Sequence, residues 1–289
     1  MPFTRWNPKV LTLRHAVSLD EHRVKFQPHL WTRDYQEQQT WDTDFDEVCC
    51  EVALHYDGYL TRLFVQVWFA GCHCGALSLA CSQYFNELKL DSVHLGVGGG
   101  SVANGTPNSL ARIPLRWMVR ECFRTTSGIM FTSDGLHDIG LDPATLYPEV
   151  QKPCPKRHSA VNHIIQSPSK YPKAYVKPVH EPHKPEEDHE LLDALSPIYD
   201  PLDLEQGRLW WILEKLPIMH EVQIDDKLEV RRWRNNGQGR IIWGQTDWKV
   251  KVHRSVWTRM QALHEDGTKY QPKASFKTAL LLGNFDWVD

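Results

Sequence analysis

The sequence of 289 residues lacks several features that would assign it to a class at once. It has no run of about 18 or more apolar residues, because polar residues interrupt even the stretch around Leu77, and a membrane-spanning helix is therefore not predicted. The formal net charge is only −3, which gives no overall attraction to nucleic acid or to an anionic membrane. Nothing like a secretory h-region follows Met1, and we expect an intracellular protein without a nucleic-acid partner.

The cysteines are odd in number and unevenly spaced, which argues against a disulfide framework. Cys72, His73 and Cys74 do not form a convincing zinc site, because adjacent residues in an extended segment point in opposite directions. Cys72 and Cys74 can converge, but a structural zinc ion needs two further ligands, and no CxxC or HxxxH partner is present. We predict neither a metal nor another cofactor.

Proline divides the chain into three parts. Residues 148–186 hold eight prolines and six lysines, and this composition predicts an extended linker because proline removes backbone donors and blocks helices. We therefore expect one region over residues 1–147 and another over residues 187–289, joined by this linker.

The first region has the order of a β/α unit. Residues 61–70, TRLFVQVWFA, form a nearly continuous apolar run that predicts a buried strand. Residues 109–125 predict a helix, with Pro114 tolerated in its first turn. A strand, a loop and a helix in this order favour the α/β class.

Arginines at 112, 116, 120 and 124 form one stripe along that helix, since residues four apart share a face. Two interpretations remain open for the stripe. It is either a solvated or acid-paired face, or a phosphate-binding surface.

The third region is rich in tryptophan and predicts a small α+β module. Residues 209–216 indicate a short helix closed by Pro217, and residues 228–243 indicate two strands of a hairpin around the turn-forming residues 235–239. Clustered aromatic residues in such a module more often form its core than a binding surface, although stacking on a ligand is the alternative.

Two kinds of chemistry remain for residues 71–102. The glycine run at residues 96–101 has the composition of a phosphate-binding loop, but it lacks the Lys-Ser/Thr of a P-loop and the spacing of a dinucleotide fingerprint. His73 follows the strand at residues 61–70, and in α/β-hydrolases the general-base histidine leaves the sheet after a strand. A structural histidine held in a turn is the other interpretation of His73.

Several motifs resemble those of a known family. The blocks RHAVSLDEHRVKFQPHLW (residues 14–31), VWFAGCHC (67–74) and VGGGSVANGTPNSLARIPLRWMVRECF (97–123) are similar to uncharacterised α/β-hydrolase proteins common in fungi, which are related to the bacterial type VI secretion phospholipase effectors. Shorter phrases at residues 194–200, 252–260 and 267–276 also resemble the fungal members. The resemblance implies a partial α/β-hydrolase-like sheet over residues 1–147, a lipid or ester substrate, and His73 as general base.

The same resemblance implies which residues support the site. Asp20 and Arg23 belong to the first block, and Gly98, Gly99 and Gly100 form the turn that holds the histidine loop in the family. Residues 75–96 stand where the family has a single aspartate, and we expect them to be an atypical insertion.

The nucleophile is missing from this pattern. The family carries its serine on a G-x-S-R-G elbow and its triad aspartate upstream of the block that begins here at residue 14, and no G-x-S-x-G occurs in this sequence. We therefore predict that this chain is the later part of a serine hydrolase and is inactive as it stands. The alternatives are a non-enzymatic interaction or ligand-binding protein, and a nucleotide-binding protein that uses the glycine run.

Overall fold

The computed structural model describes the chain in separate segments. The described residues are 10–26, 63–69, 77–82, 102, 106–125, 127–151, 159–168, 184–200, 202–203, 208–224, 227–242, 250–276 and 285–288. Among them no helix is long and apolar enough to cross a membrane.

The central feature is a five-stranded sheet with the strand order β11-β8-β2-β1-β3. Its strands are β1 (Val10–Ser18), β2 (Leu63–Phe69), β3 (Leu77–Ser82), β8 (Val250–His253) and β11 (Phe285–Val288). Strands β1, β2, β8 and β11 run parallel, and β3 pairs antiparallel with β1 at one edge. The α/β class is confirmed, and β2 confirms the strand predicted from residues 61–70.

Three smaller sheets surround the central one. They are β5 (Ile218–Ile224) with β6 (Lys227–Trp233), antiparallel, and two short parallel pairs, β4 (Ile164–Ile165) with β9 (Leu263–His264) and β7 (Ile241–Ile242) with β10 (Ser275–Phe276). The hairpin predicted within residues 228–243 is wrong. Strand β6 pairs with the preceding β5, and β7 pairs with β10 instead of returning along β6.

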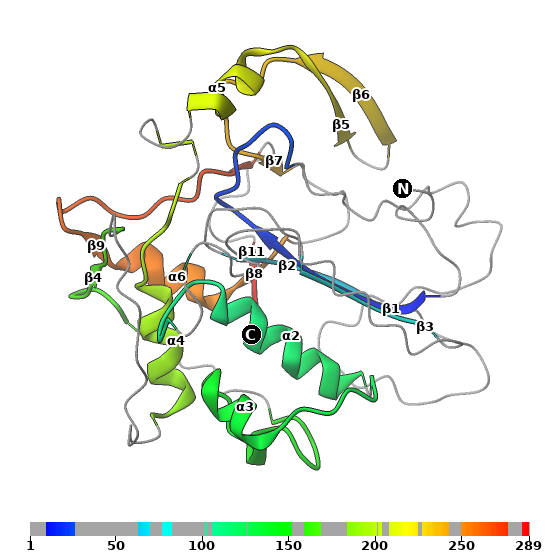
Figure 1. Ribbon diagram of the computed structural model, residues 1–289, viewed down its shortest axis with the longest axis vertical. Helices are drawn as coiled ribbons and strands as arrows, with labels where there is room; N and C mark the ends of the chain where they lie inside the picture. Colours follow the sequence, from blue (N-terminus) through cyan, green and yellow to red (C-terminus); the bar gives the residue numbers. More distant parts are fainter. Residues whose placement is uncertain are drawn as a thin grey trace.

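The helices lie beside the sheet (Figure 1). In the sequence they fall between strands of the sheet. They are α2 (Arg112–Arg124), α3 (Ser133–Asp138), the short 3-10 helix η1 (Pro143–Thr145), α4 (Glu186–Ala194), α5 (Arg208–Lys215) and α6 (Arg254–Gln261). Helix α2 confirms the helix predicted within residues 109–125. Helix α5 confirms the one predicted at residues 209–216, and it ends just before Pro217 because proline cannot continue a helix.

The hydrophobic core joins segments from both ends of the chain. Val17 and Leu19, at the end of β1, pack in one cluster with Val252 of β8 and Val256 of α6. Ile165, which lies inside the proline-rich segment 148–186, belongs to the same cluster and is 1% exposed. The division into residues 1–147, 148–186 and 187–289 stays a prediction, but the sheet takes strands from the first and third parts, and this core cluster takes residues from all three.

Part of the expected insertion belongs to the central sheet. Strand β3 lies within residues 75–96 and pairs along β1 from Ala16↔Leu77 to Val10↔Ser82. These residues thus cover the edge that β1 would otherwise expose, and an open strand edge is a site for unwanted pairing.

Candidate functional site

The candidate catalytic residue His73 and the supporting residues Asp20 and Arg23 follow two neighbouring parallel strands. Strand β1 ends at Ser18 and β2 at Phe69, and these two residues are direct partners in the sheet. In open parallel sheets, functional side chains gather beyond the carboxyl ends of the strands, so the segments after β1 and β2 leave at the same edge. Asp20 and Arg23 follow β1. His73 follows β2 but lies outside the described residues, as do Gly98, Gly99 and Gly100.

The segment after β1 is almost completely buried although most of its residues are polar. Asp20 is 1% exposed, and both of its carboxylate oxygens are bound by the C-terminal region. The hydroxyl of Tyr270 donates to Oδ2 at 2.7 Å, and the backbone N–H of Lys273 donates to Oδ1 at 3.1 Å. These contacts give Asp20 a structural role, since both oxygens are engaged in holding the chain after β1.

Arg23 binds within its own segment. Its backbone N–H and its Nη2 donate to the two oxygens of Glu21, at 2.8 and 3.0 Å. Burial raises the pKa of Glu21, but the hydrogen bonds and charge of Arg23 outweigh burial and hold this pKa below its ordinary value. The guanidinium carbon also lies 3.8 Å from the ring centre of Phe26, so Arg23 is fixed by a carboxylate and an aromatic face.

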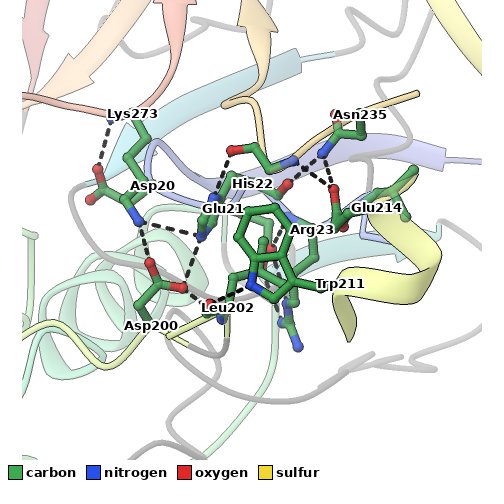
Figure 2. A network of polar contacts seen from close by, with 12 residues as sticks. Asp20, Glu21, His22, Arg23, Asp200, Leu202, Trp211, Glu214, Asn235 and Lys273 are labelled. Atoms are coloured by element: carbon green, nitrogen blue, oxygen red, sulfur yellow. Dashed lines mark hydrogen bonds and ion pairs between the residues drawn. The ribbon is translucent and has the colours of Figure 1, made fainter. Parts of the chain in front are cut away.

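His22 joins this segment to two loops of the C-terminal region (Figure 2). Its Nδ1 lies 3.0 Å from the carbonyl oxygen of Gly237 and therefore donates, and its Nε2 lies 2.8 Å from Oδ1 of Asp200. Burial raises the pKa of Asp200, but hydrogen bonds from His22 and Lys273 lower it well below the usual range. The Asp200 carboxylate is therefore ionised at neutral pH, and through His22 it holds the segment after β1 to the C-terminal region.

Glu214 of α5 is the buried acceptor of the same network (Figure 2). Its carboxylate accepts from the backbone N–H of Val24 at 2.6 Å, the side-chain amide of Asn235 at 2.5 Å and the backbone N–H of Gly237 at 3.0 Å. Asn235 also donates to the carbonyl oxygen of His22 at 2.7 Å. The side chains of Glu214 and Asn235 therefore fix the path of the backbone beyond β1.

Sequence reasoning found only some of these partners. Asp200, Tyr270 and Lys273 lie within residues 194–200 and 267–276, which we expected to resemble fungal relatives, but this expectation assigned them no role. No motif of the sequence marked Glu214 or Asn235 as a partner of this segment. Their roles depend on a contact between α5 and the segment after β1, which the sequence does not reveal.

The arginine stripe of α2 faces carboxylates. Arg116 and Arg112 contact Oδ2 of Asp193 at 2.6 and 3.5 Å, and Arg120 pairs with Glu186. Arg124 pairs with Glu121 on the same helix. The acid-paired interpretation of the stripe is thus confirmed. Arg116 and Arg120 are buried against α4, so they do not present an open phosphate-binding surface.

His253 and Ser255 have the spacing of a base and a nucleophile but act as a helix cap. Nδ1 of His253 accepts the backbone N–H of Ser255 at 3.2 Å and lies 2.9 Å from its hydroxyl oxygen, at the first turn of α6. Burial lowers the pKa of His253 to about 3, although Glu190 opposes the shift. A group with this pKa is a weak general base at neutral pH.

A cavity of about 760 Å³ lies between α2, α4 and the loop around η1. Its lining is mixed in charge, because Arg120, Lys184 and Arg254 stand with Asp142, Glu186 and Glu187. Burial and the nearby Arg112 and Arg116 lower the pKa of His189 in the same wall. No three His, Cys, Asp or Glu side chains among the described residues gather as a metal site.

The tryptophans of the C-terminal region that the structure describes pack internally. Trp210 lies 5.4 Å from Phe26, Trp233 stacks on His220 at 3.9 Å, and Trp257 meets Trp287 edge-on at 5.6 Å. Trp211 donates its Nε1–H to the carbonyl oxygen of Leu202 at 2.9 Å. These rings contribute to packing, whereas Trp243 and Trp248 lie outside the described residues.

The fold and the described site residues define an α/β protein with a buried polar segment beyond the carboxyl end of the parallel strand β1. Residues 1–121 match the family described as "T6SS, Phospholipase effector Tle1-like, catalytic domain", which confirms the resemblance seen in the motifs of this part of the chain. No curated protein matches the chain. No solved structure matches it either.

Proposed function

We propose that residues 1–121 form the base-bearing part of a serine-hydrolase site for lipid-like esters. The observation that carries this proposal is the match of these residues to a phospholipase effector catalytic domain. The parallel pair β1 and β2 supports it, because His73 follows β2 by four residues at the edge where α/β enzymes place their functional groups.

His73 is the general base in this proposal. Its imidazole takes the proton of a serine hydroxyl as the oxygen attacks the ester carbonyl, and it returns that proton to the departing alcohol. Water then hydrolyses the acyl-serine by the same route. Gly98, Gly99 and Gly100 hold the histidine loop, while Asp20 and Arg23 fix the neighbouring segment after β1.

The serine is supplied from outside these 289 residues. No G-x-S-x-G occurs in the sequence, and a base without its nucleophile held within hydrogen-bond reach does not carry out acyl transfer. The 289-residue chain alone is therefore inactive in this proposal.

The test compares the 289-residue chain with a longer product read from the transcript upstream of Met1. We expect the longer product to carry the serine elbow, to hydrolyse p-nitrophenyl esters and phospholipids, and to lose this activity in His73→Ala. His163→Ala, which changes an exposed histidine, is the matched control and should retain activity.

Two results would contradict the proposal. Ester turnover by the 289-residue chain that disappears in His73→Ala would refute its inactivity. A longer product that carries the elbow but neither hydrolyses esters nor reacts with a fluorophosphonate would refute the hydrolase assignment.

A second candidate function is that of an interaction protein, which the exposed hairpin of β5 and β6 favours. Met219 of β5 is 72% exposed and Val230 of β6 is 56% exposed. This candidate predicts a specific association of the 289-residue chain and no reaction with a fluorophosphonate.

A further inference from the structure

Strand β6 has one edge that is unpaired within the part of the chain that the structure describes. Its other edge pairs with β5, and the two form a separate two-stranded sheet at the rim of the molecule (Figure 1). Side chains on both faces of β6 are exposed, namely those of residues 229–232. Two-stranded ribbons are marginally stable alone, and an open edge presents unpaired backbone N–H and C=O groups to any strand that can pair with them.

The register of the hairpin identifies which backbone groups point outward. Residues of an antiparallel pair alternate between hydrogen-bonded and non-hydrogen-bonded positions. Ile224 and Lys227 close the hairpin and form its first hydrogen-bonded pair, so alternation turns the backbone groups of Leu228, Val230 and Arg232 away from β5. A further antiparallel strand must therefore pair with these three residues.

We propose that the partner at this edge is β6 of a second copy of the chain, related by a twofold axis at Val230. In this arrangement Val230 lies opposite Val230 of the second copy. Glu229 of each copy lies opposite Arg231 of the other. The Glu229 and Arg231 positions are then non-hydrogen-bonded pairs, in which side chains approach most closely and opposite charges stabilise the sheet. The short sequence Glu-Val-Arg is self-complementary when it is paired antiparallel with itself.

Neighbouring registers do not have this property. Moving the axis to residue 229 or 231 places Glu229 opposite Glu229, or Arg231 opposite Arg231. The backbone groups of Leu228, Val230 and Arg232 can pair in these two registers as well, because the axis still brings open groups opposite each other. The charges of Glu229 and Arg231 therefore favour the axis at Val230 over the axes at residues 229 and 231.

Among the described residues, no strand covers this edge of β6. Glu229 and Arg231 contact each other within β6 at 2.6 Å, but both side chains are about half exposed, at 45% and 55%. Exposed ion pairs of this kind contribute little, so their exchange for cross-strand pairs costs little. The exposed Met219 shares a face with Val230, and the dimer places two copies of this apolar pair on one four-stranded sheet.

One pair of strands makes a small interface, so the dimer forms in a concentration-dependent equilibrium. The proposed dimer does not depend on ester hydrolysis. Sedimentation velocity from low to high micromolar concentrations tests it with the wild type, Glu229→Arg, Arg231→Glu and the double variant that exchanges the two charges. Lys269→Glu, which reverses an exposed charge outside β5 and β6, is the control for net charge.

We expect the wild type and Lys269→Glu to dimerise alike. Each single variant places like charges opposite each other twice, and should raise the dimer dissociation constant by about tenfold or more. The double variant should return it to within about threefold of the wild type. A chain that stays monomeric, a dimer insensitive to both single variants, or a double variant as weak as the singles overturns the proposal. So does a monomeric chain that binds a different protein through β6.

Discussion

Residues 1–121 and residues 187–289 contribute to one sheet but relate differently to known proteins. The first region matches a catalytic-domain family and provides β1, β2 and β3. The second lies beyond that match and provides β8 and β11, which extend the same sheet beside β2. The boundary of a family match is thus not a boundary of the folded unit in this protein.

The two regions also bring complementary polar groups to their contacts. Helix α2 of the first region supplies buried guanidinium groups, and α4 supplies the carboxylates that neutralise them. The segment after β1 presents backbone N–H and C=O groups, and Glu214 and Asn235 of the second region bind them. Buried polar groups cost stability when they lose their partners, so changes on the C-terminal side should destabilise the region that carries the family motifs.

The largest expected effect follows from Asp193→Ala. Asp193 is fully buried and binds Arg116 at 2.6 Å and the backbone N–H of Ser109 at 2.9 Å. Its removal leaves the guanidinium of Arg116 buried without a counter-charge, which should lower the free energy of unfolding by about 3–5 kcal/mol. Urea unfolding measures this change. Asp188→Ala alters an exposed carboxylate of the same helix and should cost at most about 1 kcal/mol, and equal losses in both variants would contradict the account.

Glu214→Ala should have the next largest effect. It leaves the donors of Val24, Asn235 and Gly237 without their acceptor, and each unsatisfied buried donor costs about 1–3 kcal/mol. Allowing for relaxation and entry of water, we expect a loss of about 3 kcal/mol in the free energy of unfolding. The exposed neighbour Lys215→Ala serves as control. A loss below about 1 kcal/mol in Glu214→Ala would show that this contact between the regions is weak.

The titration of His253 should have an intermediate effect on the free energy of unfolding. Burial lowers its folded pKa to about 3, so between the ordinary pKa of 6.5 and this value the unfolded chain binds a proton that the folded chain does not. Stability therefore falls as the pH decreases through this window, by at most about 1.4 kcal/mol per pH unit.

His253→Asn removes this titration and retains a residue that caps helices well. Between pH 7 and pH 5 the wild type should lose about 2 kcal/mol more than the variant. Urea unfolding at both pH values measures the difference. Equal losses in the two proteins would mean that His253 takes up a proton in the folded state.

Tyr270→Phe should have the smallest effect. It removes the hydroxyl that donates to Asp20 at 2.7 Å, while the backbone N–H of Lys273 still binds the other oxygen. We expect a loss of about 1–2 kcal/mol, since the acceptor is charged and buried. Tyr147→Phe, at a residue 77% exposed, should leave stability unchanged in the same thermal or urea measurement. Indistinguishable variants would exclude a structural role for this bond.

Much of the local structure could be predicted from the sequence, because periodicity and chain breakers determine it. The apolar run before Ala70 and the helix that contains Pro114 are where the pattern places them, and Pro217 ends α5. The hairpin is the instructive failure. Asn235, Asn236 and Gly237 are good turn residues, yet their backbone and side-chain groups bind Glu214, and Gly239 lies so close to Lys273 that an added Cβ would meet its carbonyl oxygen at 1.8 Å.

The site was predictable in part. The motifs indicate which segments follow the strands, and the family match over residues 1–121 confirms the resemblance. The burial of Arg116 and the role of Glu214 depend on contacts between residues far apart in the sequence, and local patterns carry no information on such contacts. The catalytic role of His73 stays a prediction.

The most direct test of the shared sheet is cleavage of the chain at a protease site introduced within residues 169–183, followed by gel filtration and hydrogen exchange. The account predicts that the two fragments elute together without denaturant, because β8 pairs with β2 and α4 with α2. It also predicts that the amides of Leu13–Ser18 lose their protection when urea separates the fragments and the N-terminal one is isolated. Fragments that separate without denaturant, with these amides still protected in the isolated N-terminal fragment, would contradict it.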